Sequence, residues 1–190
     1  MSLKPGFDGV WVTTHHTMVV SGGSGEAVLS SNLLLRLIGF SLPFNDGTVK
    51  LGPWGGPGGV AWDYNPGSNT AIIEIIISHG DVVDSVSFKS INHTTGKIVS
   101  SSTHGGTGGV PDKISIDGSE EHLTLISGTI TDYFGNVVVE SLTFHTNKTK
   151  YGPYGLTNGS AFEIPMENGE IVGFFGNAGA FLDAIGSSAL

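Results

Sequence analysis

The chain has 190 residues, a formal net charge of −9 and no cysteine. Hydrophobic residues make up 38% and charged residues 13% of the sequence, which is enough apolar material for the core of one domain. The chain has only 8 basic residues but 17 acidic ones, so the sequence offers no basic stripe to bind nucleic acid or an anionic membrane surface. The lack of cysteine excludes disulfides and thiolate metal sites.

The beginning of the chain gives no targeting signal. The first residues, MSLKPGFDGVWV, contain no basic segment that leads into an apolar run, so we expect a cytoplasmic or nucleocytoplasmic protein. The most apolar stretch, 33–44, contains Arg36 and Pro43 and is too short to span a bilayer, so no membrane insertion is expected. Without a secretory signal, the three N-x-S/T sequons are interpreted as chance matches: Asn92, Asn147 and Asn158.

Residues 1–47 are expected to form an extension that differs from the rest of the chain. The alternating apolar residues of 10–20 fit one or two strands, a loosely docked arm, or a fragment of another domain. His15 and His16 are adjacent, and adjacent residues of a strand point to opposite faces. We therefore interpret this pair as surface residues and not as a metal site, and assign the extension no function.

From residue 50 onward the sequence has the pattern of short β-strands. These segments are rich in Val, Ile, Thr and Phe, and Gly, Asn, Asp or Pro separates them. No window holds apolar residues at helical spacing long enough to predict a helix. The pattern predicts an all-β sandwich, barrel or prism, with strands in 71–80, 82–88, 113–116, 123–130, 136–146, 161–165 and 170–176.

Two motifs recur at intervals of about fifty residues. The first is a glycine cluster: GPWGGPGGV at 52–60, THGGTGGV at 103–110 and YGPYGLTNG at 151–159. The second reads glycine, three residues, then a fifth position: GDVVDS from Gly80, GNVVVE from Gly135 and GAFLDA from Gly179. The fifth position is Asp84, Val139 and Asp183 in turn. Three copies of a four-strand unit predict three small sheets around a pseudo-threefold axis.

The second motif places a carboxylate four residues after a glycine, where it can fold back beside the amides of its own loop. A carboxylate acceptor beside several amide donors suits a ligand with vicinal hydroxyls, because each hydroxyl both donates and accepts a hydrogen bond. A glycine pair opposite would let the backbone approach the ligand where a Cβ would collide. Each piece alone is more often a plain turn, but the recurrence of both motifs in one chain favours a shallow site for a polyol.

On these residues the sequence resembles the jacalin-related lectin family of plants, most closely its mannose-specific, banana-lectin-like branch. The resemblance covers about 48–186 and rests on GPWGGPGG, GDVVDSVSF, GGTGG, ISG, VVVESLTFHTNK, YGPYG, NGEIVGFFG and GAFLDAIG, in the family's order. It implies a β-prism I of three four-stranded Greek-key sheets in a lectin domain at 48–190. It also implies no catalysis, no metal or other cofactor, and mannose- or glucose-containing glycans bound at one end of the prism.

The resemblance implies two sugar sites. At site 1, Asp183 would accept from two sugar hydroxyls, the amides of Ala180 and Phe181 would donate, and Phe181 would add an apolar wall. At site 2, Asp84 would take the role of Asp183. The full sets are Gly59, Gly179, Ala180, Phe181 and Asp183 for site 1, and Gly109, Asp81, Val82 and Asp84 for site 2.

Sugar preference and assembly are also expectations from the resemblance. Galactose-preferring members are cleaved just before the glycine that matches Gly59 and carry an aromatic residue where this chain has Asn136. Here GGPGGVAWD runs on unbroken, which favours the mannose type. The family implies a homodimer or homotetramer and a role in plant defence. Two departures are Asn177, where many members have Arg, and the ending SSAL, which predicts weaker pairing of the last strand.

Two other functions compete with the lectin interpretation. An enzyme would need a nucleophile, a base and an orienting group in one pocket, and the spacing of His79, Asp81 and His104 does not force this. No G-x-S-x-G or H-E-x-x-H motif occurs. The second alternative is a β-prism protein-interaction or scaffold module without sugar binding. The two retained aspartates argue against it.

Overall fold

The structure, a computed structural model, describes residues 9–13, 16–20, 27–28, 36–37 and 48–190, apart from 68 and 166–168. All regular secondary structure in this part of the chain consists of β-strands, which confirms the all-β prediction. No helix long and apolar enough to cross a membrane occurs among these residues. Backbone contacts divide the chain into two units, Met1–Asn45 and Asp46–Leu190, close to the boundary expected after residue 47.

The described part of the first unit contains four short strands, where the sequence analysis allowed for one or two. β1 (Gly9–Thr13) pairs antiparallel with β2 (His16–Val20), and β3 (Ala27–Val28) pairs antiparallel with β4 (Arg36–Leu37). His15, half of the histidine pair, lies outside the described residues.

Thirteen strands lie in the described residues of the second unit. They are β5 (Val49–Gly55), β6 (Val60–Tyr64), β7 (Thr70–His79), β8 (Val83–Asn92), β9 (Ile98–Ser100), β10 (His104–Gly105), β11 (Val110–Ser115), β12 (Leu123–Tyr133), β13 (Asn136–Thr146), β14 (Lys150–Gly155), β15 (Ser160–Pro165), β16 (Ile171–Ala178) and β17 (Leu182–Ala189).

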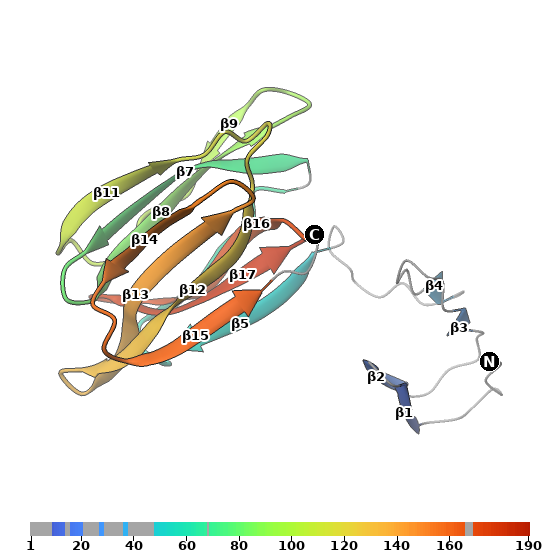
Figure 1. The fold of residues 1–190 in the computed structure, drawn as a ribbon, viewed down its shortest axis with the longest axis horizontal. Coiled ribbons are helices and arrows are strands. Elements are labelled where there is room, and N and C mark those ends of the chain that lie inside the picture. Colours follow the sequence, from blue (N-terminus) through green and yellow to red (C-terminus); the bar gives the residue numbers. More distant parts are fainter. Residues whose placement is uncertain are drawn as a thin grey trace. The chain divides into compact units, whose positions relative to one another are not determined.

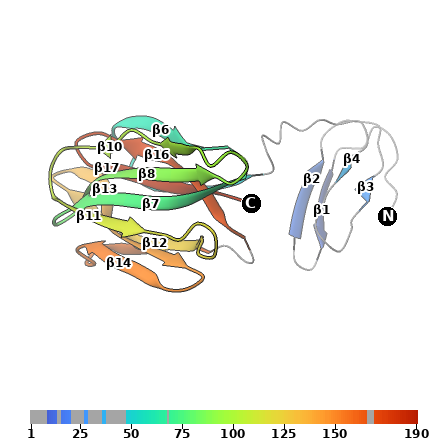
Figure 2. The same cartoon turned by 90° about the horizontal axis from the view of Figure 1, so that it is seen from above.

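These strands form three antiparallel sheets. The first sheet has the order β5-β17-β16-β6, the second β10-β8-β7-β11, and the third β14-β13-β12-β15. In the second sheet the edge beside β8 is shared by β9 and β10, so this sheet also has four strand positions. Each order is that of a Greek key, in which the fourth strand returns beside the first. The two views in Figure 1 and Figure 2 show the sheets facing one another around a common interior.

The first sheet closes the prism, because it combines β5 and β6 with the last two strands of the chain. Ala189 pairs with Val49 on one side and with Ile171 on the other. Beyond it, Leu190 and Glu170 exchange backbone hydrogen bonds of 3.0 and 3.3 Å. The SSAL ending is therefore paired through Leu190, because backbone pairing does not need an aromatic side chain, and its weaker pairing relative to the family stays a prediction.

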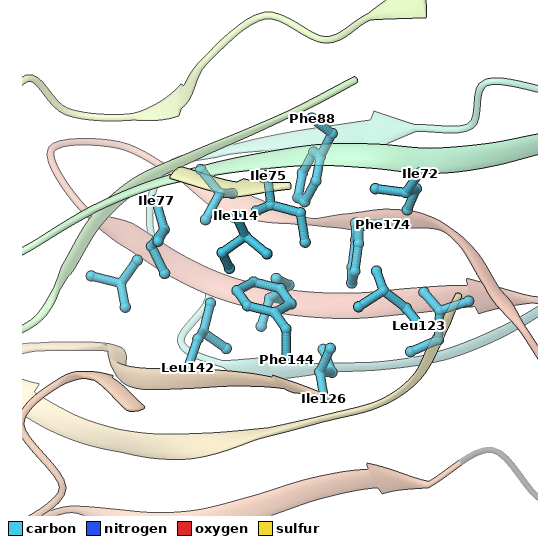
Figure 3. Close-up of a cluster of buried hydrophobic side chains, with 14 of the residues drawn as sticks. Ile72, Ile75, Ile77, Phe88, Ile114, Leu123, Ile126, Leu142, Phe144 and Phe174 are labelled. Carbon is cyan, nitrogen blue, oxygen red and sulfur yellow. The ribbon is translucent and has the colours of Figure 1, made fainter. Parts of the chain in front are cut away.

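The core lies where the three sheets meet (Figure 3). Each sheet contributes a phenylalanine that is at most 2% exposed: Phe88 from the second, Phe144 from the third and Phe174 from the first. The ring centroids of Phe88 and Phe174 lie 4.6 Å apart, and those of Phe144 and Phe174 lie 6.2 Å apart. Alternate residues of the inner strands fill the space around them, as the period of two in a strand requires.

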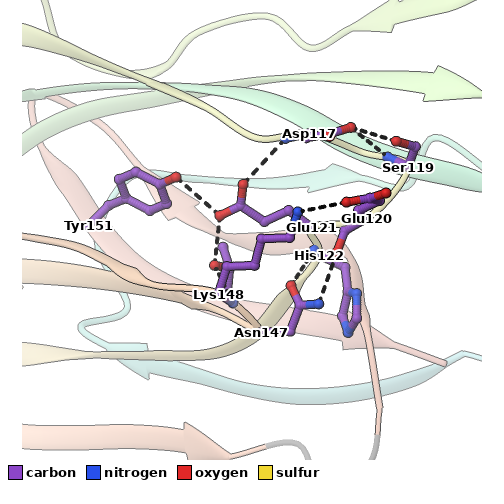
Figure 4. A network of polar contacts seen from close by, with 9 residues as sticks. Asp117, Ser119, Glu120, Glu121, His122, Asn147, Lys148 and Tyr151 are labelled. Atoms are coloured by element: carbon purple, nitrogen blue, oxygen red, sulfur yellow. Dashed lines mark hydrogen bonds and ion pairs between the residues drawn. The ribbon is translucent and has the colours of Figure 1, made fainter.

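A polar network fixes the end of the third sheet where β12 begins (Figure 4). The carboxylate of Glu121 is buried there and accepts hydrogen bonds from the hydroxyls of Thr146 and Tyr151, at 2.7 and 3.1 Å. These bonds hold the pKa of Glu121 below its usual value, with the Thr146 bond contributing most. The predicted sugar loops lie at the opposite end of the sheets.

Candidate functional site

Three loop ends meet where β8, β13 and β17 begin (left in Figure 1). In each sheet the connection between the two inner strands faces the glycine cluster between the two outer strands. The pairs are 179–181 with 56–59 in the first sheet, 80–82 with 106–109 in the second, and 134–135 with 156–159 in the third. A buried acidic side chain lies between the members of each pair: Asp183, Asp84 or Glu140.

At site 1 the glycine cluster packs directly on the carboxylate of Asp183. An ideal Cβ on Gly58 would lie 2.5 Å from Oδ1, and one on Gly59 would lie 2.6 Å from Oδ2. Gly59 also has a φ of 68°, a conformation that side chains other than glycine rarely adopt. The expected proximity of Gly59 and Asp183 is thus present, but the reason for glycine differs: a Cβ would collide with the carboxylate before it met any ligand.

The site 1 loop forms a tight turn closed by a backbone hydrogen bond. The amide of Gly179 donates to the carbonyl of Phe181 at 2.9 Å, which closes the turn. Among the described residues, the amides of Ala180 and Phe181 donate to no other group. Two donors are therefore available beside one buried acceptor.

Asp183 as a residue is only 7% exposed, and its Oδ2 has no hydrogen-bond partner among the described residues. This oxygen lies close to both Gly59 and Gly179, since ideal Cβ atoms on these residues would be 2.6 and 3.4 Å from it. Burial raises the pKa of Asp183, against the opposing effect of the Gly179 and Asp183 amides. A buried oxygen without a partner calls for an explanation, and a ligand hydroxyl would supply one.

Site 2 repeats this geometry in the second sheet. Ideal Cβ atoms on Gly108 and Gly109 would lie 2.2 and 2.5 Å from the carboxylate of Asp84. The amide of Gly80 donates to the carbonyl of Val82 at 3.0 Å, as Gly179 does to Phe181. Burial raises the pKa of Asp84, and the nearby His79 lowers it by a smaller amount.

The two sites differ in the last residue of the loop, which is Phe181 at site 1 and Val82 at site 2. The side chain of Val82 is buried and can offer a ligand only its backbone. The side chain of Phe181 is half-buried and packs edge-on against Tyr133 of the third hairpin, with ring centroids 5.3 Å apart. Tyr133 in turn contacts Phe134, which is 87% exposed. The sequence analysis missed these two aromatic residues beside site 1, because the contact joins separate sheets.

The third copy of the carboxylate is Glu140, and the alignment that placed Val139 there is wrong. An ideal Cβ on Gly155 would lie 2.0 Å from the carbonyl oxygen of Glu140, as one on Gly55 would lie 2.1 Å from that of Asp183. The third motif has one residue more between glycine and acid. All three sheets have the same register shift at the acidic residue, so the additional residue lies in the third hairpin, where strand pairing continues beyond Val139 to Asn136.

The third position lacks two features of site 1: a carboxylate oxygen that still needs a hydrogen-bond partner, and a free loop beside it. Oε2 of Glu140 accepts hydrogen bonds from the Gly159 amide at 2.6 Å and from the Thr129 hydroxyl at 2.7 Å, so this oxygen already has partners. The loop is replaced by a two-residue hairpin turn at Phe134 and Gly135, both with positive φ. Strand pairing there extends to the last residues before the turn, which leaves no free loop corresponding to 179–181.

The residues considered for an enzyme do not converge. His79 contacts Asp112 at 2.9 Å and the ring of Tyr154, whereas Asp81 lies in the exposed loop of site 2. His104 stacks on Trp62 with ring centroids 4.3 Å apart, and burial lowers its pKa. Within the described ranges no group of three His, Asp or Glu residues could hold a metal ion.

Asn177 makes a contact beside site 1, as its position in the sequence suggested. Its Nδ2 donates to the carbonyl of Pro57 at 3.5 Å, which links strand β16 to the first glycine cluster. The amide thus ties the cluster to the strand that leads into the sugar loop.

Comparisons with known proteins agree with this fold. A family model for the jacalin-like lectin domain matches residues 51–188. A mannose/glucose-specific lectin of Parkia pendula is 44% identical over 153 residues, which are 77% of this chain and 32% of that protein. This chain therefore spans about a third of the length of that relative.

Two solved structures show the same arrangement of sheets. Wild-type Malaysian banana lectin is 38% identical, with a TM-score of 0.69 over 76% of this chain and 99% of the other. A mannose-specific jacalin-related lectin from Morus nigra, solved in complex with mannose, is 43% identical, with a TM-score of 0.66 over 75% and 94% of the two chains. The predicted β-prism of three four-stranded sheets is thereby confirmed.

Proposed function

Because the chain belongs to the jacalin-like lectin family, we propose that it is a non-catalytic lectin that binds mannose or glucose residues at two sites. One observation carries this proposal: the buried Oδ2 of Asp183 has no partner among the described residues and lies beside Gly59 and two unused loop amides. In the second sheet, Asp84 is likewise buried against two glycines, Gly108 and Gly109.

The hydrogen-bond donors and acceptors at each site determine which ligand groups it can bind. An ionised carboxylate only accepts, so it can take hydrogen bonds from two neighbouring sugar hydroxyls. The oxygens of the same hydroxyls can then accept from the loop amides of Ala180 and Phe181, or of Asp81 and Val82. Bonds to a charged acceptor in a partly desolvated site are stronger than neutral ones.

The shallow sites imply weak binding of one sugar and a need for several sites together. A millimolar dissociation constant corresponds to about 4 kcal/mol. Linking sites raises the avidity for a branched glycan by a factor of about 10² to 10⁴ without new contacts. Two sites per chain in a homodimer or homotetramer would supply such linkage, and we propose this assembly with twofold symmetry.

A preference for mannose over galactose is part of the proposal. It is supported by the named specificities of the relatives above and by the unbroken segment that precedes Gly59. It is also supported by Asn136, because no aromatic side chain occupies that position.

Calorimetric titration with methyl α-mannoside and methyl α-galactoside tests the proposal. We expect binding of the mannoside alone, and its loss in the double variant Asp84→Asn, Asp183→Asn with the circular dichroism unchanged. The matched control is Glu140→Gln, which changes the third carboxylate in the same way and should bind as the wild type does. Failure of the intact protein to bind either sugar would refute the lectin proposal.

A protein-interaction module is the second candidate, favoured by one observation. Phe134 is 87% exposed and Val137 is 41% exposed on the same hairpin, at the end of the prism that carries both sites. Scattered exposed apolar residues are ordinary, but two on one protruding hairpin fit a protein contact. If neither sugar binds, this hairpin is the surface to test next by Phe134→Ser.

A further inference from the structure

Two of the glycine clusters contact the loop of a neighbouring sheet as well as their own carboxylate. An ideal Cβ on Gly106, in the cluster of site 2, would lie 2.1 Å from the carbonyl oxygen of Ala180 in the loop of site 1. An ideal Cβ on Gly56 would lie 2.2 Å from the carbonyl oxygen of Val137 in the third hairpin. In both places two backbones touch with no room for a side chain.

The third cluster makes the equivalent contact through a hydrogen bond. The amide of Leu156 donates to the carbonyl of Asp81, in the loop of site 2, at 3.2 Å. The three contacts close a ring, since each cluster supports a loop of the next sheet around the axis. The third cluster, which holds no free carboxylate, is therefore part of the support of site 2.

The geometry of the peptide unit connects these contacts with sugar recognition. The carbonyl of Ala180 and the amide of Phe181 belong to one planar unit. The cis peptide bonds of the described chain precede Pro53 and Pro153, so the unit after Ala180 is trans and its N–H points opposite to its C=O. With the carbonyl held against Gly106, the Phe181 N–H points away from the second sheet's cluster.

We propose that Gly106 is a positioning residue for site 1, although it lies in the glycine cluster of site 2. Its bare Cα lets the Ala180 carbonyl pack against it, and this contact fixes the direction of the Phe181 N–H that donates to the sugar. Leu156 has the same role for the Val82 N–H of site 2. The inference rests on the proposed function, because it assigns the support of donors at those sites.

The substitution Gly106→Ala isolates this contact. The backbone of Gly106 is not in the left-handed region, so alanine introduces no conformational strain of its own. The added methyl collides with a backbone oxygen, so one of the two segments must move. The amide of Gly106 is held by a 3.0 Å hydrogen bond to the carbonyl of Asp84, whereas Ala180 lies exposed in a three-residue loop. We therefore expect the loop of site 1 to move.

Mannoside binding at each site is measured separately, in a variant whose other site is inactivated. In the Asp84→Asn protein, Gly106→Ala should weaken methyl α-mannoside binding at site 1 by about tenfold or more. In the Asp183→Asn protein, the same substitution should change binding at site 2 by less than about threefold. The matched control is Gly56→Ala, which has an equal collision against the hairpin that holds no sugar, and it should leave site 1 within about threefold of its background.

The opposite pattern would overturn the inference. If each methyl displaces its own cluster, Gly106→Ala would weaken binding at site 2 and Gly56→Ala would weaken binding at site 1.

Should Gly106→Ala fail to fold, Leu156→Pro tests the same kind of support between sheets, since it removes the amide that donates to Asp81. It should weaken site 2 in the Asp183→Asn background and spare site 1 in the Asp84→Asn background. Equal loss at both sites would contradict the proposal.

A readout without sugar separates this inference from the proposed function. The ¹H–¹⁵N resonance of Phe181 should shift in Gly106→Ala and stay in place in Gly56→Ala, whether or not any sugar binds. A shifted resonance in a protein that binds no sugar would refute the lectin proposal and keep the positioning role. An unchanged Phe181 resonance in Gly106→Ala would refute the positioning role itself.

Discussion

The amide of Gly159 donates a 2.6 Å hydrogen bond to Oε2 of Glu140, so the third acidic side chain of the prism is satisfied from within the protein. At the equivalent place in the first sheet, Oδ2 of Asp183 has no partner among the described residues. The side chain of Glu140 is one methylene group longer than that of Asp183. Glu140 thus stabilises the fold, whereas Asp183 can accept hydrogen bonds from a ligand.

This difference predicts that Glu140 contributes to stability and not to sugar binding. Glu140→Ala leaves the Gly159 amide and the Thr129 hydroxyl without their charged acceptor, so we expect a loss of about 1.5 to 3 kcal/mol in the free energy of unfolding. Urea titration measures this loss, and mannoside binding should persist. Glu163→Ala, on the exposed face of β15, is the control and should change the free energy by less than about 0.5 kcal/mol. Loss of a sugar site in Glu140→Ala would contradict the assignment.

The packing of Gly58 predicts a selective effect on site 1. A Cβ there would lie 2.5 Å from Oδ1 of Asp183, and the backbone of Gly58 is outside the left-handed region. Gly58→Ala should therefore push the carboxylate aside and weaken mannoside binding at site 1 by about tenfold or more, measured in the Asp84→Asn background. Gly80→Ala, whose Cβ would meet no atom within 4 Å, is the control for an added methyl at this end of the prism. Equal affinities of the two variants at site 1 would show that the carboxylate tolerates displacement.

Much of this site could be predicted from the sequence, because its signals are local. The glycine clusters and the loops that end in Asp84 and Asp183 recur with fixed spacing, and the structure places each loop against its cluster. The segments rich in Val, Ile, Thr and Phe likewise predicted strands, since β-branched and aromatic residues favour them.

The rest depends on contacts that sequence spacing does not encode. The role of Glu140 was missed because the third hairpin is longer: its strands pair as far as Tyr133 and Asn136, so Gly135 does not correspond to the glycines that begin the other two loops. The contact of Gly106 with Ala180 joins residues far apart in the chain, and the edge-on packing of Phe181 on Tyr133 does the same. Such pairs become neighbours only after three sheets close around one core.

The raised pKa values of Asp183 and Asp84 predict that sugar binding weakens in mild acid. Burial raises both pKa values above 3.8, so each group takes up a proton at a higher pH than an ordinary aspartate does. A protonated carboxyl must donate with one oxygen and loses an acceptor for the sugar hydroxyls. Mannoside affinity should thus be constant near neutral pH and fall as the pH decreases through these raised values. Affinity that stays constant down to pH 3.8, with the fold intact, would contradict the role of the carboxylates.

Glu121 predicts a separate dependence of stability on pH. Its folded-state pKa is lowered from 4.5, mainly by the Thr146 hydroxyl, so its ionised form stabilises the folded protein above the unfolded pKa. This contribution is lost as the pH falls through the lowered value. In urea titrations, the wild type should exceed Glu121→Gln in stability at pH 7, and the difference should shrink in acid. A difference that is the same at pH 7 and in strong acid would show that the charge of Glu121 has no part in it.

The most direct test of two sites per chain is a ¹H–¹⁵N titration of the uniformly labelled protein with methyl α-mannoside. It counts sites by position and does not depend on tight binding. We predict saturable shifts of the loop amides at both sites, Ala180 and Phe181 at site 1 and Asp81 and Val82 at site 2, with none at Val137 beside Glu140. Shifts at one loop only, at neither loop, or at Val137 as well would contradict the account.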